Sequence, residues 1–159
     1  MKKIFILGLI CCMLGILSGC GSKEDGSAEK KELSVEELSN RLFSELTYED
    51  SLSMLNNEVA LKYYGIDPEI VKSSAVYIST GATAEEIAVF EAVSNGDADT
   101  IYEACVKRKD TQIMSYSDYK PSETSRLDHH VLRKSGRFVV FCVNYDDNEV
   151  NRIIDDVLD

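Results

Sequence analysis

A cysteine behind a short apolar run is the residue of this chain whose chemistry can be predicted most directly. Two lysines give the chain a positive start, residues 4–17 are almost wholly apolar, and Leu17-Ser18-Gly19-Cys20 ends the run. A charged start, a short apolar stretch and small residues at a cut site are the layout of a secretory signal segment. We therefore expect export of the chain and cleavage between Gly19 and Cys20.

The four residues at the end of this run look like a bacterial lipobox, in which the cysteine thiol forms a thioether with a diacylglyceryl group before cleavage. The likeness implies that Cys20 is the first mature residue and carries the lipid, with acyl chains such as palmitate. Two chains hold a protein stably on a membrane, whereas one binds marginally. A membrane-spanning helix needs about 20 apolar residues. Residues 4–17 are fewer, so we expect a lasting lipid anchor and no span.

Two further cysteines remain once the leader is removed with Cys11 and Cys12. Cys105 and Cys142 could form one disulfide outside the cytoplasm, but cysteine also packs as a small hydrophobe. Both lie in apolar-patterned segments, which favours two packed thiols. A catalytic cysteine needs an electropositive setting, which an acidic chain with two histidines hardly supplies.

The two histidines, His129 and His130, are adjacent on a predicted strand. Successive strand residues point to opposite faces, so the two rings should diverge rather than share a metal. The chain has no HExxH and no paired CxxC pattern, which are the usual zinc spacings. We predict no metal, no cofactor and no catalytic residue. A small hydrolase that pairs a carboxylate with one of these histidines is the alternative.

Two charged stretches have a simpler interpretation than a binding site. Residues 146–149, Asp-Asp-Asn-Glu, lack the spacing and the glycine of an EF-hand calcium loop, and they match a helix N-cap. Residues 107–109, Lys-Arg-Lys, lie within a predicted helix. Side chains of three successive helical residues splay around the axis, so this triplet predicts a solvated face.

Net charge limits the partners. The formal charge is −11, and loss of two lysines with a leader that has no acidic residue makes it −13. Nucleic acids and anionic lipids both require a basic patch, so we expect no nucleic-acid binding. Because the chain has 28 acidic residues, some carboxylates will lie close together by chance, and a close pair is weak evidence for catalysis.

The chain divides into three parts. Residues 1–19 are the predicted signal peptide, and residues 20–32 are the lipidated cysteine with a polar, charged tether that has no aromatic residue. Twelve such residues reach roughly 20 Å as a coil. Residues 33–159 have about the length of one domain.

Capping patterns and periodicity locate the elements of that domain. They predict helices after Ser34, at Asn57, after Thr83, at Asp97 and after Asp146. The pattern Thr83-Ala84-Glu85-Glu86 is interpreted as the capping box of a helix that ends near residue 95. Strands are predicted over 74–80, 127–134 and 137–144, and residues 48–55 fit an edge strand or an extended loop.

Strands and helices do not strictly alternate in this order. The sequence therefore predicts an α+β fold, with a small, largely antiparallel sheet of about three strands packed by several helices.

A resemblance to a known family rests on three segments. They are Ser-Thr-Gly-Ala-Thr-Ala-Glu-Glu-Ile-Ala-Val-Phe at 79–90, Tyr-Gly-Ile-Asp at 64–67, and 146–148. Together they resemble an uncharacterised family of bacterial lipoproteins, domain of unknown function 4358, over most of residues 33–159. The resemblance implies an α+β surface lipoprotein on the outer face of the cytoplasmic membrane, in a Gram-positive bacterium, and it brings no catalytic residue.

These observations favour a non-catalytic binding or interaction module of the cell envelope. We expect it to contact the membrane through the lipid on Cys20 and to bind an envelope protein or a wall component. Tyrosines either leave an amphipathic binding surface or belong to the core, and both interpretations stay open. The residues concerned are Tyr63, Tyr64, Tyr77, Tyr102, Tyr116 and Tyr119.

Overall fold

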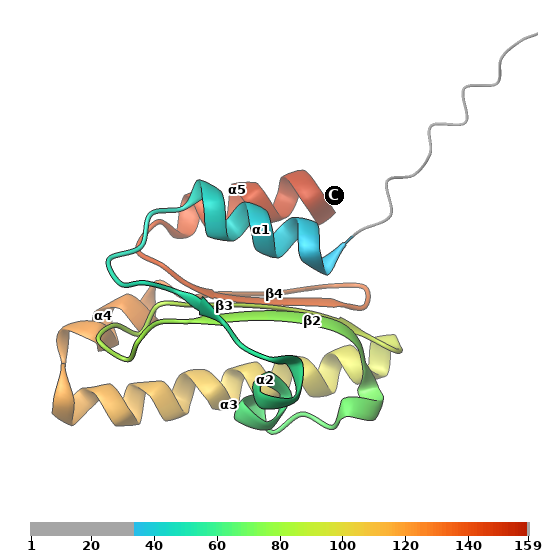
Figure 1. Ribbon diagram of the computed structural model, residues 1–159, viewed down its shortest axis with the longest axis horizontal. Helices are drawn as coiled ribbons and strands as arrows, with labels where there is room; N and C mark the ends of the chain where they lie inside the picture. Colours follow the sequence, from blue (N-terminus) through green and yellow to red (C-terminus); the bar gives the residue numbers. More distant parts are fainter. Residues whose placement is uncertain (1–33, 159) are drawn as a thin grey trace, which may run out of the picture. The chain divides into compact units, whose positions relative to one another are not determined.

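Five strands form one antiparallel sheet in the computed structural model, which describes residues 34–158 (Figure 1). Their spatial order is β1-β2-β3-β5-β4. The strands are β1 (Ser53–Met54), β2 (Val71–Ile78), β3 (Glu86–Ala92), β4 (Val131–Ser135) and β5 (Phe138–Val143). The predicted α+β class and antiparallel sheet are confirmed, with five strands where about three were predicted.

Helices cover both faces of this sheet (Figure 1). One face carries α1 (Val35–Glu45) and α5 (Asp147–Leu158), and the other carries α2 (Asn57–Tyr64) and α3 (Asn95–Tyr119). A short helix, α4 (Ser122–Asp128), follows α3, and a single 3-10 turn (Pro68–Ile70) precedes β2. None of the helices within residues 34–158 has both the length and the apolar character that a membrane crossing requires.

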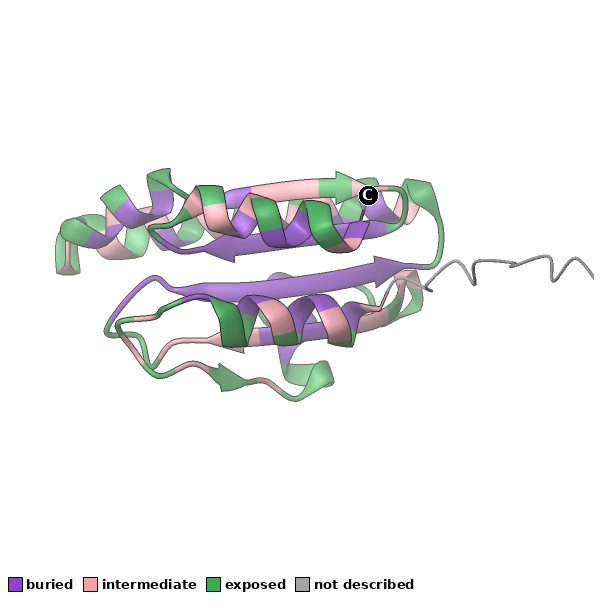
Figure 2. Cartoon of the chain, turned by 90° about the horizontal axis from the view of Figure 1, so that it is seen from above, coloured by how far each residue is buried: buried purple, intermediate pink, exposed green. Residues whose placement is uncertain are grey.

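The central strands β3 and β5 are buried along their whole length (Figure 2). Alternation along a strand divides their side chains between two cores. Ile87 and Val89 pack under α1 and α5, whereas Ala88 and Phe90 pack against α2 and α3. A strand covered on both faces has no polar side to alternate with, which explains the continuous apolar run of β5.

Local caps begin and end the helices where the sequence predicts. The Ser34 hydroxyl accepts a hydrogen bond from the Glu37 amide at 3.4 Å, and Asp146 accepts one from the Glu149 amide at 3.0 Å. Gly65 ends α2 with φ +66°, a left-handed conformation that glycine adopts without steric cost. These three predictions are confirmed.

The helix predicted after Thr83 is wrong, because residues 86–92 form the central strand β3. Its capping-box pattern is a turn feature: the Thr83 hydroxyl accepts from the Glu85 amide at 3.4 Å and donates to the Glu85 carboxylate at 2.9 Å. A continuous apolar run does not by itself distinguish a buried strand from a buried helix. The segment is therefore a hairpin, and no helix N-terminus lies there.

A second correction concerns the stretch before β4. The strand predicted from residue 127 begins at Val131, because α4 extends to Asp128 and the two histidines connect it to β4. The expected strand over 74–80 is β2, displaced by three residues at its start. The ambiguous stretch 48–55 is mostly loop and contributes the two-residue edge strand β1.

Both cysteines within residues 34–158 are free, buried and on opposite faces of the sheet. Cys105 lies on α3 and Cys142 on β5. The two cysteines are therefore packed thiols and form no disulfide. Burial raises the pKa of Cys142 to about 12, and it also raises the pKa of Cys105.

Neither of these thiols should react in the folded protein, because only the exposed thiolate is a good nucleophile. We predict that iodoacetamide at pH 8 leaves Cys105 and Cys142 unmodified in the native full-length chain and modifies both after unfolding in urea. Peptide mass spectrometry measures both states. Labelling of either residue in the native protein, or a peptide pair linked by a disulfide, would contradict this packing.

Candidate functional site

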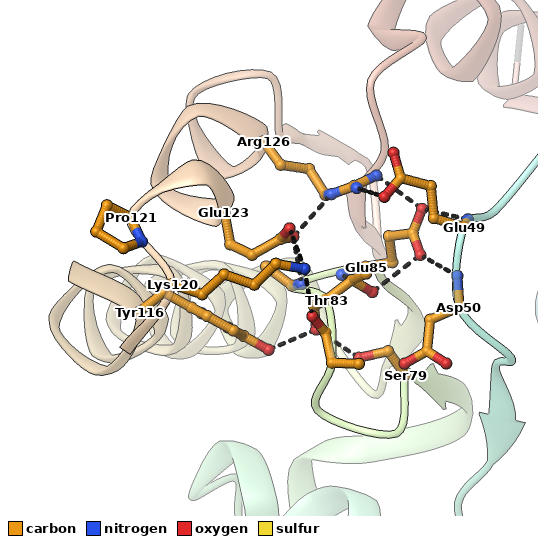
Figure 3. A network of polar contacts seen from close by, with 12 residues as sticks. Glu49, Asp50, Ser79, Thr83, Glu85, Tyr116, Lys120, Pro121, Glu123 and Arg126 are labelled. Atoms are coloured by element: carbon orange, nitrogen blue, oxygen red, sulfur yellow. Dashed lines mark hydrogen bonds and ion pairs between the residues drawn. The ribbon is translucent and has the colours of Figure 1, made fainter. Parts of the chain in front are cut away.

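A buried carboxylate, Glu85, fixes the loop that joins β2 to β3 (residues 79–85, here the β2–β3 loop). Its two oxygens accept hydrogen bonds from the backbone amides of Glu49 and Asp50, each at 2.9 Å. One of them also pairs with the Arg126 guanidinium at 2.7 Å. Glu85 thus connects the loop after α1, the start of β3 and α4 (Figure 3).

Arg126 is the other centre of this network, with a side chain only 2% exposed. Its remaining nitrogens bond to Glu123 at 2.9 Å and to Glu49 at 2.8 Å, and its guanidinium lies 4.0 Å from the Tyr145 ring centre. A buried cation is tolerated only when it is paired and hydrogen-bonded on all sides. Glu49, Glu85, Glu123 and Arg126 together are called the Arg126 network below.

The same network and the end of α3 hold the β2–β3 loop in place (Figure 3). The Glu123 carboxylate accepts from the Ala84 amide at 2.9 Å. The Tyr116 hydroxyl donates to the Thr83 carbonyl, and Lys120 donates to the Ala82 carbonyl at 2.7 Å. Because four separate segments meet here, the position of the loop depends on this set of polar contacts.

Removal of the cation tests that dependence. We predict that Arg126→Met lowers the free energy of unfolding by about 3–5 kcal/mol, because it leaves the buried Glu85 carboxylate without a counter-charge and leaves Glu123 paired only with Lys120, at 3.1 Å. The control is Arg133→Met, whose ion pair with Asp155 is exposed and should contribute no more than about 1 kcal/mol. Urea unfolding followed by circular dichroism measures both variants. Equal losses in the free energy of unfolding would show that the buried Arg126 ion pairs contribute no more than an exposed ion pair.

Glu86, the next residue, points to the opposite face of the sheet and is 1% exposed. Its carboxylate accepts from Arg108 at 3.2 and 2.7 Å, from Gln112 at 2.9 Å and from the Tyr64 hydroxyl. Burial, together with the nearby charge of Glu86, raises the pKa of Tyr64. Tyr64 therefore stays a neutral donor at physiological pH.

The basic triplet 107–109 is thus more than the solvated face predicted for it. Arg108 lies over the sheet with a side chain 13% exposed and pairs with Glu86. Its guanidinium also stacks 4.2 Å from the Tyr63 ring centre. The prediction treated the triplet as a unit, but helix geometry turns its middle residue inward.

A cleft of about 280 Å³ opens above this pair, between α3 and the β2–β3 loop. We call it the α3 cleft. Tyr63, Tyr116 and Tyr119 contribute aromatic side chains, and Gly81, with φ +96°, lies in the loop wall. The other lining residues are Ile78, Ser79, Thr83, Glu86, Arg108, Gln112 and Ser115.

One residue that lines the α3 cleft has a buried polar atom without a partner. The Gln112 side chain is 4% exposed, and its amide oxygen Oε1 is buried without a hydrogen bond. Leaving such a group unsatisfied costs about 1–3 kcal/mol. Among the residues described, Oε1 is the only buried side-chain polar atom in this condition.

The sequence left open whether the tyrosines form a binding surface or belong to the core, and the structure shows both cases. Tyr64 is buried in the core, whereas Tyr63 and Tyr119 are exposed and line the α3 cleft. Tyr77 stacks against Phe43 on the face that carries α1, with ring centres 4.9 Å apart.

The histidines lie away from the α3 cleft, in the connection before β4 rather than on a strand. His129 is half exposed, with Nδ1 4.0 Å from a carboxylate oxygen of Asp147. His130 bonds through Nδ1 to the Leu127 carbonyl at 2.7 Å. Residues 34–158 contain no group of three His, Cys, Asp or Glu side chains that could hold a metal ion. The acidic stretch 146–149 begins α5, as predicted.

A larger groove, of about 550 Å³, runs between α1 and the β1–β2 edge. Three charged side chains line it, and two of them, Lys72 and Glu91, pair with each other at 2.9 Å; the third is Glu36. No buried polar side chain that lines it lacks a hydrogen-bond partner. The groove therefore has less to offer a polar ligand than the α3 cleft.

The model of the family described as Domain of unknown function (DUF4358) matches residues 45–144. The chain belongs to this family. The match spans the Arg126 network and every residue that lines the α3 cleft of this DUF4358 domain. No curated protein and no solved structure matches the chain. The predicted cleavage and lipidation residues, Gly19 and Cys20, lie outside the residues that the structure describes.

Sequence reasoning missed the residues that organise this DUF4358 domain. Glu85 and Glu86 were assigned to a helix cap, and Arg126 and Gln112 were not selected at all. Two acidic residues directly before an apolar run were the available signal, because charged residues are rarely buried unless they are paired.

Proposed function

We propose that this domain is a non-catalytic binding module of an extracytoplasmic lipoprotein, held on the outer face of the cytoplasmic membrane by a lipid on Cys20. We further propose that the α3 cleft is its binding site. The observation that carries the second proposal is a cleft whose buried charges neutralise each other while one buried acceptor, Gln112 Oε1, has no partner.

The chemistry of the α3 cleft favours binding over catalysis. A general base needs a free lone pair within reach of its substrate, but Glu86 already accepts four hydrogen bonds. A nucleophilic hydroxyl needs an adjacent base. Ser79 and Ser115 instead donate to backbone carbonyls, at 2.6 and 2.9 Å. These side chains are fixed in positions that can hold a ligand, and none is arranged to transfer a proton.

The alternative, a hydrolase that uses a carboxylate and a histidine, has less support. Neither His129 nor His130 lines the α3 cleft. His129 is half exposed and 4.0 Å from the nearest oxygen of Asp147, beyond hydrogen-bond distance. A general base should lie within hydrogen-bond reach of its partner.

A lipid anchor also fits the charge of the chain. A mature charge of −13 follows from loss of two lysines from −11, and such a protein is repelled by an anionic membrane surface. Stable residence at the membrane then requires a covalent anchor. A domain held there would meet wall components and envelope proteins first.

The anchor is tested by metabolic labelling with radioactive palmitate in a bacterial host. We predict that Cys20→Ala abolishes labelling, because it removes the thiol that would carry the lipid. Cys12→Ala is the matched control and should label like the wild type, since Cys12 lies within the leader. Persistent labelling of Cys20→Ala would exclude the anchor.

The binding site is tested by photocrosslinking in native membranes. We predict that p-benzoylphenylalanine at position 119, on the exposed rim of the α3 cleft, forms a discrete adduct. The same group at position 43, exposed on α1 across the sheet, should form none. Gel electrophoresis and mass spectrometry detect the adducts. Equal adducts from both positions, or none from position 119, would contradict a binding site in the cleft.

A further inference from the structure

We infer that the α3 cleft takes a small, uncharged carboxamide, such as the N-acetyl group of an amino sugar or the backbone amide of a short peptide. This inference rests on the proposed function, since it takes the cleft to be the binding site. Its basis is a donor and an acceptor side by side on α3, at Arg108 and Gln112, above a neutralised pair of charges.

The acceptor is Gln112 Oε1. The Gln112 amide nitrogen donates to Glu86 at 2.9 Å, so a flipped amide would place its oxygen against a carboxylate. The hydrogen-bond network therefore fixes the orientation of the amide and leaves Oε1 as the buried atom without a partner. A ligand N–H in the cleft would satisfy it after a small rotation of the side chain.

The donor is Arg108. Its Nε and Nη2 atoms bond to Glu86, and Nη2 also bonds to the Tyr63 hydroxyl at 3.0 Å. Nη1 has no hydrogen bond to any residue of the described chain. Guanidinium donors bind carbonyl oxygens strongly because the donor is charged. Arg108 and Gln112 both line the cleft, so a ligand there could accept from Nη1 and, once the Gln112 side chain rotates, donate to Oε1.

The paired charges of Arg108 and Glu86 favour a neutral ligand over a singly charged one. A carboxylate would bond to Arg108, but it has no donor for Gln112 and would meet the negative charge of Glu86. An ammonium group would satisfy Gln112 but would be repelled by Arg108. A carboxamide has both a carbonyl oxygen and, unless fully substituted, an N–H, and it carries no charge.

The rim and the size of the cleft agree with this chemistry. Tyr63 and Tyr119 are 47% and 75% exposed, and such aromatic faces pack against sugar rings and peptide planes. A volume of about 280 Å³ is close to the lower limit of roughly 300 Å³ for ligand pockets. One sugar residue or a blocked amino acid therefore fits better than a long polymer.

The test is saturation-transfer NMR on the purified full-length lipoprotein in detergent micelles. The probes are N-acetylglucosamine and N-acetylalanine N-methylamide, which carry the amide on a sugar and on a peptide. Glucose and acetate are the controls, because glucose lacks the amide and acetate replaces it with a charged carboxylate. We expect the strongest saturation at the acetyl methyl group of a bound probe and none for the controls.

Variants connect the signal to the cleft. Gln112→Met removes the acceptor and should weaken binding by about tenfold or more, as loss of one buried hydrogen bond implies. Tyr119→Ala alters only an exposed rim residue, so it tests the site even if the first variant folds poorly. Met114→Ala, exposed on α3 outside the cleft, should bind like the wild type.

The outcomes separate this inference from the proposed function. Binding of only the sugar, or of only the peptide probe, supports the carboxamide class and identifies its source. Binding of acetate or glucose as tight as that of the amides, or undiminished binding by Gln112→Met and Tyr119→Ala, overturns the class. If no probe binds while position 119 still forms a photoadduct, the ligand class is wrong and the binding site stands. If no probe binds and position 119 forms no photoadduct, the proposed binding site in the cleft fails as well.

Discussion

The buried contact between Glu85 and Arg126 is the constraint on which this end of the molecule depends. It joins the start of the central strand β3, the loop after α1 and the short helix α4, and it places the β2–β3 loop that walls the α3 cleft. A buried ion pair is weak evidence for net stability, because desolvation offsets most of the attraction. Its effect here is positional: displacing the loop would separate Glu85 from Arg126 and from the backbone amides of Glu49 and Asp50.

Two consecutive carboxylates link the architecture to the proposed site. Because successive strand residues face opposite sides, Glu85 serves the Arg126 network and Glu86 lies under the α3 cleft. A one-residue slip of β3 in the sheet would exchange these environments and reverse both cores, so its register is strongly specified. Glu86, the first residue of β3, pairs with Ile78 of β2 and with Val143 of β5 and so fixes that register at the start of the strand.

The sequence was sufficient wherever the signal is local. Ser34 and Asp146 predicted the starts of α1 and α5, and the strand predicted over 137–144 is β5. It was insufficient for β3, because the Thr83 turn imitates a helix cap and a fully buried strand has no alternation. The side-chain partners of Glu85 and Glu86 could not be predicted for another reason. Arg126 is 41 positions from Glu85, and Gln112 is 26 positions from Glu86. Such pairs are set by tertiary packing, which no local pattern encodes.

The central claim is that the domain binds its ligand in the α3 cleft. Amide chemical-shift mapping tests it most directly, with isotope-labelled full-length protein and a soluble digest of the host cell wall. The account predicts concentration-dependent shifts centred on the backbone amides of Gly81, Ser115 and Tyr119, which line the cleft. Shifts centred on the α1 groove instead, at Asn40 and Ser73, would contradict it.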